Sequence, residues 1–241
     1  LMLIGIKEIL IIINPCEEVL FQKLIGDGRK FGIKITYKIQ EKPEGIAQAF
    51  LIASDFINGN SSVLILGDNI FYGDGLIKKL KKANECENAA TIFGFRVKDP
   101  ERYGVIEFDK NKLVKSICEK PSLPKSQYAV TGIYFYDKGV VNYAKTIQKS
   151  QRGELEITDL NNIYIKNGNL KAEIFGRGSS WFDTGTIDSL LEASNFIYNL
   201  EKRQSFKIGC PEEAAWRNNW LNSDEEESLK KFNYNNEYGN Y

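Results

Sequence analysis

Five short clusters of charged, glycine and aromatic residues contain the side chains of this sequence that could do chemistry. They are residues 40–45, 67–69, 101–105, 119–121 and 181–185. Each cluster follows an apolar, strand-like run or precedes a helix-like one, which places it at a strand end or a helix start. In an α/β sheet these are the positions where ligands bind.

Asp68 and Asp183, from two of these clusters, are the candidate metal ligands. Two carboxylates at separate strand ends could hold one hard cation and leave coordination positions for water and phosphate, as Mg²⁺ prefers. Lys120 would supply a point charge to a phosphate, and Glu119 could accept protons from sugar hydroxyls. Gly45 has no Cβ, so its backbone could approach a ring closely. Together these residues predict a metal-assisted enzyme acting on a phosphorylated, hydroxyl-rich substrate.

Each cluster also has a purely structural explanation, because the same residue types form turns and helix starts. Residues 67–69 favour a turn, residues 183–185 would be a turn before a helix, and residues 119–121 would be a solvated strand end. Taken singly, such a cluster is more often structural than functional. The shared placement of all five is what favours a functional interpretation.

The composition excludes several classes of function. The chain has no histidine, which rules out Ser-His-Asp triads, Cys-His pairs and His-ligated metals. Lys plus Arg and Asp plus Glu both number 32, so no excess of charge favours nucleic acid or an anionic membrane. No apolar run approaches the roughly 18 residues of a membrane helix. The four cysteines form no C-x-x-C pair and fit free thiols in a reducing cytoplasm.

Alternating strand and helix patterns predict an α/β fold in the first part of the chain. The expected strands are residues 9–13, 33–39 and a run from residue 63, and the expected helices are residues 17–25, 45–57 and 76–84. The run from residue 63 has four consecutive apolar residues before Gly67, typical of a strand buried on both faces. This order implies βαβ units and a largely parallel sheet.

From residue 90 the pattern changes to closely spaced strands and then returns to helices. The expected strands are residues 90–97, 103–108, 113–118, 129–136 and 170–175. The expected helices are residues 139–148, 155–166 and 186–203, with short helices from residue 211. The predicted organisation is one α/β domain over residues 1–204 and a helical C-terminal extension over residues 205–241.

Six segments of the sequence form an ordered set of motifs. The most specific are Asp68-Asn-Ile-Phe-Tyr-Gly73 and Arg152-Gly-Glu-Leu-Glu-Ile-Thr-Asp159, and the others lie at residues 99–105, 119–121, 128–132 and 181–185. In order and spacing the set resembles the bacterial glucose-1-phosphate thymidylyltransferases of the sugar nucleotidyltransferase superfamily, over nearly the whole chain. The resemblance implies a Rossmann-like nucleotide-diphospho-sugar transferase fold, with a mixed, mostly parallel sheet flanked by helices.

The resemblance also implies roles for individual residues. Asp68 and Asp183 would bind Mg²⁺ and, together with Lys120, form the catalytic group. Gln40 and Gly45 would contact the thymine base. The sugar-phosphate pocket would be lined by Tyr103, Gly104, Glu119, Lys120 and Val130, with Lys120 on the phosphate. The implied reaction joins dTTP and glucose-1-phosphate into dTDP-glucose and pyrophosphate, for a deoxysugar pathway such as that to dTDP-rhamnose, in a cytoplasmic homotetramer.

One part of the family pattern is absent from this sequence. The family begins with a Gly-Gly-x-Gly-Thr-Arg-Leu loop and a Pro-x-Ser-Lys segment, which hold the triphosphate. We therefore expect an N-terminally truncated copy that lacks the first βα unit, on the order of 30 to 45 residues. We also expect the 241-residue chain alone to be poorly soluble and catalytically silent, because phosphate-binding groups are lost and strand edges are left unpaired.

Two other classes of function remain open. A metal-dependent glycosyltransferase of similar fold would also use carboxylates, although those enzymes usually place two acidic residues one apart, whereas Asp68 is followed by Asn69 and Ile70. The other alternative is a non-catalytic module that binds a sugar nucleotide. Preference for thymidine over uridine depends on one methyl group, worth only about 1 kcal/mol.

Overall fold

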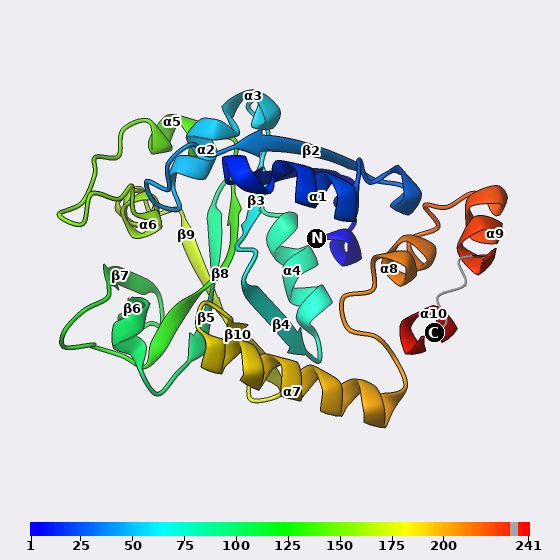
Figure 1. Ribbon diagram of the computed structural model, residues 1–241. Helices are drawn as coiled ribbons and strands as arrows, with labels where there is room; N and C mark the ends of the chain where they lie inside the picture. Colours follow the sequence, from blue (N-terminus) through cyan, green and yellow to red (C-terminus); the bar gives the residue numbers. More distant parts are fainter. Residues whose placement is uncertain (232–235) are drawn as a thin grey trace. The chain divides into compact units, whose positions relative to one another are not determined.

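The computed structural model describes residues 1–231 and 236–241 (Figure 1). The chain forms two compact units, of which the first joins residues 1–41 to residues 187–241 and the second is the continuous segment 42–186. The predicted boundary between residues 204 and 205 rests on a different criterion, the end of the α/β pattern, and stays a prediction.

The first unit begins with a βαβ arrangement. Strand β1 (Glu8–Ile13) pairs in parallel with β2 (Lys34–Ile39), and helix α1 (Glu18–Ile25) connects them. The parallel pairing requires such a crossover, because two parallel strands cannot be joined by a tight turn. The predicted strands at residues 9–13 and 33–39 and the helix at residues 17–25 are confirmed.

The rest of the first unit is helical. It consists of α7 (Ile187–Gln204), α8 (Pro211–Arg217), α9 (Ser223–Lys231) and α10 (Glu237–Asn240). The predicted long helix at residues 186–203 and the short helices after residue 211 are confirmed. Residues 232–235 of the predicted C-terminal extension lie outside the described residues.

The core of the first unit is built from both ends of the sequence. Phe31, Ile33 and Ile35 are buried together with Ala215 of α8, and Trp220 packs against this cluster. Gly32 has a backbone φ of +64°, and a Cβ there would lie 2.7 Å from the Trp220 carbonyl oxygen. The close approach of the two segments therefore requires glycine at position 32.

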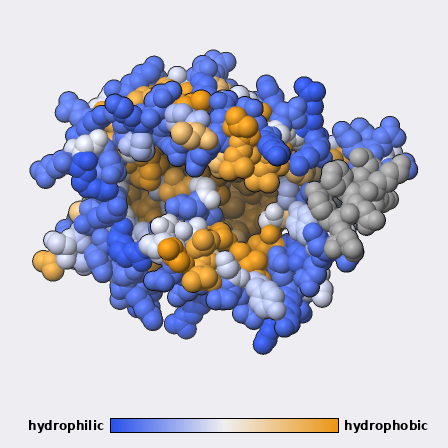
Figure 2. Space-filling view, viewed as in Figure 1, coloured by the Kyte–Doolittle hydropathy of each residue, from blue (hydrophilic) through white to orange (hydrophobic). Residues whose placement is uncertain are grey.

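Helix α1 carries an exposed apolar face. Its side chains Val19, Leu20 and Leu24 are 79%, 65% and 71% exposed. They form a hydrophobic patch over the helix in the space-filling view (Figure 2). This face differs from β2, where Ile35 is buried in the core and residues 36–39 are half-buried.

The second unit is organised around β8 (Tyr128–Tyr136), whose residues after Tyr128 are all buried. The strand order of the sheet is β7-β6-β8-β5-β9, with β3 also paired to β8. The other strands are β3 (Ser62–Ile65), β5 (Ala90–Arg96), β6 (Gly104–Phe108), β7 (Val114–Glu119) and β9 (Leu170–Ile174). The predicted mixed α/β class, and each of these strands to within about two residues, are confirmed.

The share of parallel pairing is smaller than we expected. Among the described strand pairs, β1 with β2 and β5 with β9 are parallel, whereas β8 is antiparallel to β3, β5 and β6. The physical reason is that β6 and β7 form an antiparallel hairpin, and β8 then returns beside β6. Closely spaced strands after residue 90 leave no room for the crossover helices that parallel pairing needs.

A separate two-stranded ribbon joins β4 (Asn69–Gly73) to β10 (Ser179–Asp183) in antiparallel pairing (Figure 1). Neither strand was predicted, because the polar and glycine residues 67–69 and 183–185 at their ends favour turns. Their pairing is long-range, so it is not visible as a local pattern. The ribbon is important because the two acidic residues predicted to bind metal lie at one end of it: Asp183 is the last residue of β10, and Asp68 directly precedes β4.

The helix expected at residues 76–84 is confirmed, whereas the other helices of the second unit are shorter than the sequence pattern suggested. They are α2 (Gln48–Ile52), α3 (Ser54–Ile57), α4 (Leu76–Asn84), α5 (Val140–Ala144) and α6 (Ile157–Lys166). The single helix expected at residues 45–57 is wrong in its start and continuity, since Gly45 has a φ of +105° and the helix is interrupted at Ala53. None of the helices in the described residues is long and apolar enough to cross a membrane.

Candidate active site

The ribbon of β4 and β10 brings Asp68 and Asp183 to the same end. Asp183 is paired in register with Asn69, the residue after Asp68. Thr184 then donates hydrogen bonds to the Asp68 carbonyl oxygen from its backbone N–H (2.9 Å) and its hydroxyl (2.8 Å). The two acidic residues are therefore neighbours in space, although they are far apart in sequence.

The carboxylates of Asp68 and Asp183, called here the carboxylate pair, face one small open space. Gly185 has no side chain, and a Cβ placed there would lie 3.2 Å from Asp183 Oδ1 and 3.7 Å from Asp68 Oδ2. The Gly185 backbone N–H also donates to Asp183 Oδ1 at 3.1 Å. Glycine at position 185 thus keeps open a space that both carboxylates border.

The charge of the carboxylate pair is not neutralised by a direct ion pair in the described part of the chain. Arg102, whose charge interacts with that of Asp183, forms its ion pair with Asp99 at 2.8 Å. The pKa of Arg102 is raised mainly by that hydrogen bond, with a smaller contribution from the charge of Asp183. Two carboxylates that share a space without a bound cation repel each other, and such a site favours a positive ion.

The carboxylate pair fits Mg²⁺ by the chemistry of its donors. Mg²⁺ is usually held by one or two carboxylates and completes its coordination with water and substrate phosphate. Within residues 1–231 and 236–241, no group of three or more His, Cys, Asp or Glu side chains is arranged to hold a metal. The protein would therefore supply two ligands and leave the remaining positions to water and phosphate.

Asn69 connects the carboxylate pair to the main sheet. Its Nδ2 donates to Asp68 Oδ1 at 2.8 Å, and its Oδ1 accepts from the Gly132 backbone N–H at 3.0 Å and from Trp181 Nε1 at 2.6 Å. These contacts join β4, β8 and β10 at one side chain. Sequence reasoning gave Asn69 only a place in a turn, because its partners are far away along the chain.

A second group of site residues lies where β6 and β7 pair. Gly104 is opposite Glu119 in the register, and the Lys120 backbone N–H donates to the Tyr103 carbonyl oxygen at 3.0 Å. The structure therefore brings together four residues of the predicted sugar-phosphate pocket. They come from two clusters that the sequence placed at separate strand ends.

Glu119 is held by two residues that the sequence motifs contained without an assigned role. Thr158 Oγ1 donates to Glu119 Oε2 at 2.5 Å, and Arg152 Nη1 lies 3.8 Å from Glu119 Oε1. Arg152 also contacts the carboxylates of Glu154 (2.9 Å) and Glu156 (3.5 Å). We call Glu119, Arg152 and Thr158 the Glu119 cluster. The signal that could have identified Arg152 and Thr158 is their place in the specific motif at residues 152–159.

Gly104 leaves the room that the Glu119 cluster needs. A Cβ at Gly104 would lie 3.2 Å from Thr158 Oγ1 and 3.3 Å from Glu119 Oε2, closer than most side-chain contacts. Any larger residue at this position would press on the hydrogen bond between Thr158 and Glu119. Packing therefore explains the glycine at position 104, in addition to the role that the sequence resemblance implies.

Lys120 has an unusual backbone conformation for a residue with a side chain. Its φ is +41°, in the left-handed region that favours glycine, and its side chain is exposed. Such conformations cost on the order of 1–3 kcal/mol and are concentrated at functional sites. The conformation directs the chain away from β7 directly after Glu119.

Tyr103 connects the Glu119 cluster to the ribbon. Its ring lies 5.1 Å from the Trp181 ring, and the Arg102 guanidinium lies 5.4 Å from the Tyr103 ring centre. Burial raises the pKa of Tyr103, Arg102 opposes this shift, and Asp183 adds to it. Both groups of polar residues are thus linked through aromatic contacts inside the second unit.

The other three predicted site residues belong neither to the carboxylate pair nor to the group at β6 and β7. Val130 is on β8, is 8% exposed and pairs with Gly94 of β5. Gly45 lies against the backbone of Leu155, where a Cβ would come within 2.5 Å of the Leu155 carbonyl oxygen. Gln40 belongs to the first unit, where its N–H donates to the Ile13 carbonyl oxygen at 2.8 Å.

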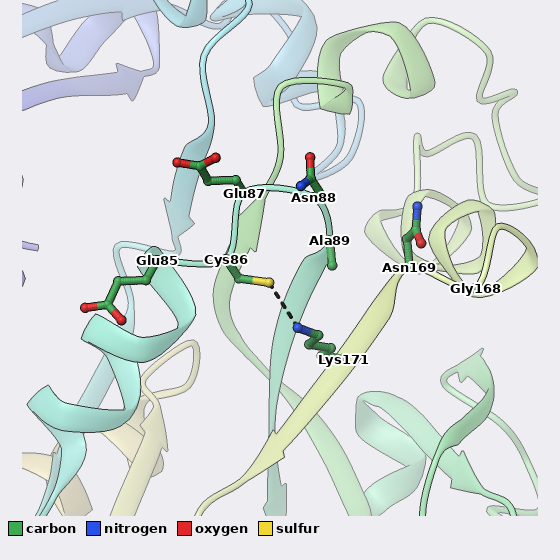
Figure 3. Close-up of a pocket in the computed structure, with 8 residues that line it drawn as sticks. All are labelled: Glu85, Cys86, Glu87, Asn88, Ala89, Gly168, Asn169 and Lys171. Carbon is green, nitrogen blue, oxygen red and sulfur yellow. Dashed lines mark hydrogen bonds between the residues drawn. The ribbon is translucent and has the colours of Figure 1, made fainter.

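A cavity of about 530 Å³ lies elsewhere in the second unit (Figure 3). Its lining includes the loop before β5 and the loop before β9, and Lys171 Nζ lies 3.2 Å from Cys86 Sγ. Ala89 precedes β5 and Asn169 precedes β9, so the cavity is at the amino ends of these parallel strands. Ligands of α/β sheets bind at the carboxyl ends, which is where Gly94 and Val130 lie. None of the predicted site residues lines this cavity.

Comparison with protein families gives one match that covers most of the chain. Residues 1–199 match the family model described as nucleotidyl transferase. The chain is 51% identical over 241 residues to the glucose-1-phosphate thymidylyltransferase of Xanthomonas campestris pv. campestris (strain B100), covering 100% of this chain and 82% of the relative. It is 50% identical to the enzyme of that name from Neisseria gonorrhoeae, covering 100% of this chain and 84% of the relative.

Solved structures show the same fold. A Bacillus anthracis protein assigned as a glucose-1-phosphate thymidylyltransferase, solved in complex with a sucrose, has a TM-score of 0.75 and 38% sequence identity. That match covers 86% of this chain and 80% of the other. A UDP-glucose pyrophosphorylase complexed with UDP-glucose has a TM-score of 0.71 at 19% identity, over 82% of this chain and 83% of the other. At that identity the second match bears on the fold alone.

Proposed function

The chain belongs to the nucleotidyl transferase family, and from this membership we propose that it joins dTTP and glucose-1-phosphate into dTDP-glucose and pyrophosphate. In this reaction a phosphate oxygen of glucose-1-phosphate attacks the α-phosphorus of dTTP. The bond between the α-phosphorus and the oxygen that bridges to the β-phosphate breaks, and pyrophosphate leaves. Relatives at 42–51% identity across at least 98% of this chain are named glucose-1-phosphate thymidylyltransferase, which supports the choice of substrates.

The observation that carries the proposal is the convergence of Asp68 and Asp183 on the space that Gly185 leaves open. We propose that Mg²⁺ binds there. The ion would supply charge neutralisation to the reacting phosphates, the main requirement of phosphoryl transfer. Asp68 and Asp183 would bind it through their carboxylate oxygens. Because Gly185 has no side chain, a phosphate could enter the space beside the ion.

The sugar phosphate is proposed to bind beside the Glu119 cluster. Lys120 would donate to the phosphate, since it is exposed and its backbone turns away from β7. Glu119 would accept hydrogen bonds from sugar hydroxyls through the lone pairs of its carboxylate oxygens that Thr158 and Arg152 do not use. Tyr103, Gly104 and Val130 would form the wall of the pocket, and positioning of this kind supplies much of the catalysis.

The thymine base is assigned to Gln40 and Gly45 by the resemblance to the family. Gly45 is already in close contact with Leu155, and its carbonyl oxygen accepts from the Gln48 backbone N–H at 3.2 Å. An amide side chain such as Gln40 can pair with the donor and acceptor of a pyrimidine ring. Base preference is tested by comparing dTTP with UTP under identical conditions.

The central experiment measures pyrophosphate release by the purified chain with dTTP, glucose-1-phosphate and Mg²⁺. Release that requires all three supports the proposal and argues against a glycosyltransferase, which would transfer sugar from a nucleotide sugar. Calorimetry with dTDP-glucose accompanies the assay. Binding without any pyrophosphate release would instead support a sugar-nucleotide-binding module, and would agree with the expectation that the 241 residues alone are silent.

The wider setting of the enzyme is also a proposal. The four free cysteines fit a reducing cytoplasm, and dTDP-glucose would feed a deoxysugar pathway such as that to dTDP-rhamnose. A homotetramer is the expected assembly. Light scattering at several protein concentrations tests the assembly, and a monomer at all of them would contradict it.

A further inference from the structure

We propose that Asn69 is a positioning residue that holds the Asp68 carboxylate in the orientation needed to bind the cation. This inference rests on the proposed metal site and goes beyond it, because Asn69 itself is not a ligand.

The direction of the Asn69 amide is set by two donors. The Gly132 backbone N–H and Trp181 Nε1 both donate to Asn69 Oδ1, at 3.0 Å and 2.6 Å. A backbone N–H and an indole N–H can only donate, so they require an acceptor at this position. The amide oxygen must therefore face Gly132 and Trp181, which leaves Nδ2 facing Asp68, 2.8 Å from Oδ1.

Gly132 makes the contact with Asn69 possible. A Cβ at position 132 would overlap the Asn69 amide. Gly132 is on the buried central strand β8, and its carbonyl oxygen accepts from the Leu66 backbone N–H at 2.9 Å. The same glycine thus anchors the segment before Asp68 and the residue after it to the sheet.

Trp181 fixes the amide from the other side. Its ring packs against Tyr103, directly before β6, at 5.1 Å and against Phe95 of β5 at 6.0 Å, so these neighbours hold the indole N–H in place. Asn69 is therefore the point at which the sheet determines the geometry of the β4–β10 ribbon. The position of β10 also places Asp183, the second carboxylate.

Asp68 needs such support because its side chain is exposed. An exposed carboxylate samples several rotamers, and it must give up this freedom to bind a metal. A hydrogen bond to Oδ1 fixes the carboxylate before the cation arrives and leaves Oδ2, the oxygen near Gly185, available for it. Loss of a partner that orients a metal ligand typically weakens metal affinity about 10- to 100-fold.

The test measures Mn²⁺ binding to the purified chain, using Mn²⁺ in place of Mg²⁺ and electron paramagnetic resonance to count the free ion. Asn69→Ala should weaken binding about 10- to 100-fold, and Asp68→Asn should abolish it. Asn162→Ala is the matched control. Asn162 also bridges two segments, with its side chain bonded to the backbone of Ile117, and its loss should leave the Mn²⁺ affinity unchanged.

A second variant separates positioning from simple loss of structure. Trp181→Phe keeps an aromatic ring and removes only the N–H that orients Asn69, and it should weaken Mn²⁺ binding by about threefold, the value of a modest hydrogen bond. In the double variant Asn69→Ala with Trp181→Phe, the affinity should equal that of Asn69→Ala alone, because Trp181 acts through Asn69.

Three results would overturn the inference. The first is that the unsubstituted chain does not bind Mn²⁺. The second is that Asn69→Ala and Trp181→Phe both keep a Mn²⁺ affinity within twofold of the unsubstituted chain, and the third is that the losses of binding free energy add up in the double variant. If Asn69→Ala does not fold, as judged by circular dichroism, the Trp181→Phe result decides alone. The proposed function is tested separately: pyrophosphate release from dTTP and glucose-1-phosphate bears on the reaction alone, and the effect of Asn69 on Mn²⁺ binding stands or falls by itself.

Discussion

The carboxylate pair and the Glu119 cluster both contain carboxylates, but of these only the carboxylate of Glu119 has a cationic partner among the described residues. Asp68 and Asp183 form no ion pair in the described part of the chain, and they border an open space at Gly185. Glu119 is met by Arg152 and by the hydroxyl of Thr158. A carboxylate left without a cation is suited to bind one, whereas a neutralised carboxylate is suited to accept hydrogen bonds from a neutral ligand. The environment, and not the residue type, therefore separates the two roles.

The largest effect is expected from Asp68→Asn or Asp183→Asn, which removes the uncompensated charge from the carboxylate pair. In a version of the protein that carries the family's N-terminal glycine loop, loss of one electrostatic partner of the reacting phosphates should lower kcat by about 1000-fold. The free energy of unfolding should change little, because each side chain lies at the edge of the fold and packs in no core. Steady-state pyrophosphate release and urea unfolding measure the two quantities. Near-normal turnover in either variant would remove that residue from the metal site.

A smaller effect is expected at Lys120, on the side of the Glu119 cluster. Lys120→Ala should raise the KM for glucose-1-phosphate about 10- to 100-fold, since a hydrogen bond to a charged group contributes about 1.5–3 kcal/mol. The KM for dTTP should change much less. Lys110→Ala, in the exposed turn after β6, is the control. Equal effects of Lys120→Ala on both substrates would mean that Lys120 is only a surface charge.

The third effect tests whether Glu119 needs its neutralising partners. Thr158→Val keeps the shape of the side chain and removes the hydroxyl that donates to Glu119 at 2.5 Å. We expect the KM for glucose-1-phosphate to rise about tenfold, the value of one charged hydrogen bond near the lower end of its range. Thr146→Val, which removes a hydroxyl bonded to the Tyr143 carbonyl oxygen on an exposed turn, should leave both KM values unchanged. An unaltered KM in Thr158→Val would separate Glu119 from sugar binding.

The smallest effect concerns Glu107, a neutralised carboxylate outside both groups. Lys115, Lys125 and Ser116 bind it, and together they lower its pKa from 4.5 to about 2. Because this pKa is lower than in the unfolded chain, the stabilisation is present above about pH 4.5 and is lost as the pH falls towards 2. Lys115→Ala should raise the pKa of Glu107 more than Lys125→Ala does, and turnover should not change. Titration of the Glu107 carboxyl by NMR checks this order.

The family and most of the strands were predictable because they depend on local information. The motifs at residues 68–73 and 152–159 indicated the family that the comparisons show. The apolar runs at β5 and β8 reveal buried strands, since burial on both faces leaves a continuous apolar stretch. The apolar run at residues 63–66 also contains a strand, but the expectation that it is buried on both faces is wrong: among the described strands β3 pairs only with β8, and its residues are half-buried.

The parts that were missed depend on contacts between distant segments. Strands β4 and β10 are recognised only as a pair, and Asn69 is opposite Asp183 for reasons that no local pattern contains. The roles of Asn69 and Thr158 follow from partners on other strands and helices. Gly45 was expected to make room for a ring, whereas the structure shows that it first makes room for Leu155. Close approach of two backbones is invisible in a sequence until the fold brings them together.

The core of the first unit has a consequence for the order in which the protein folds during synthesis. Phe31, Ile33 and Ile35 are buried with Ala215, which the ribosome adds only after the whole second unit has been made. The continuous segment 42–186 can fold as soon as it emerges, whereas β2 must wait for α8. A nascent chain halted after residue 186 should therefore expose Phe31, Ile33 and Ile35, and chaperones that bind unfolded apolar segments should hold it until the last helices appear.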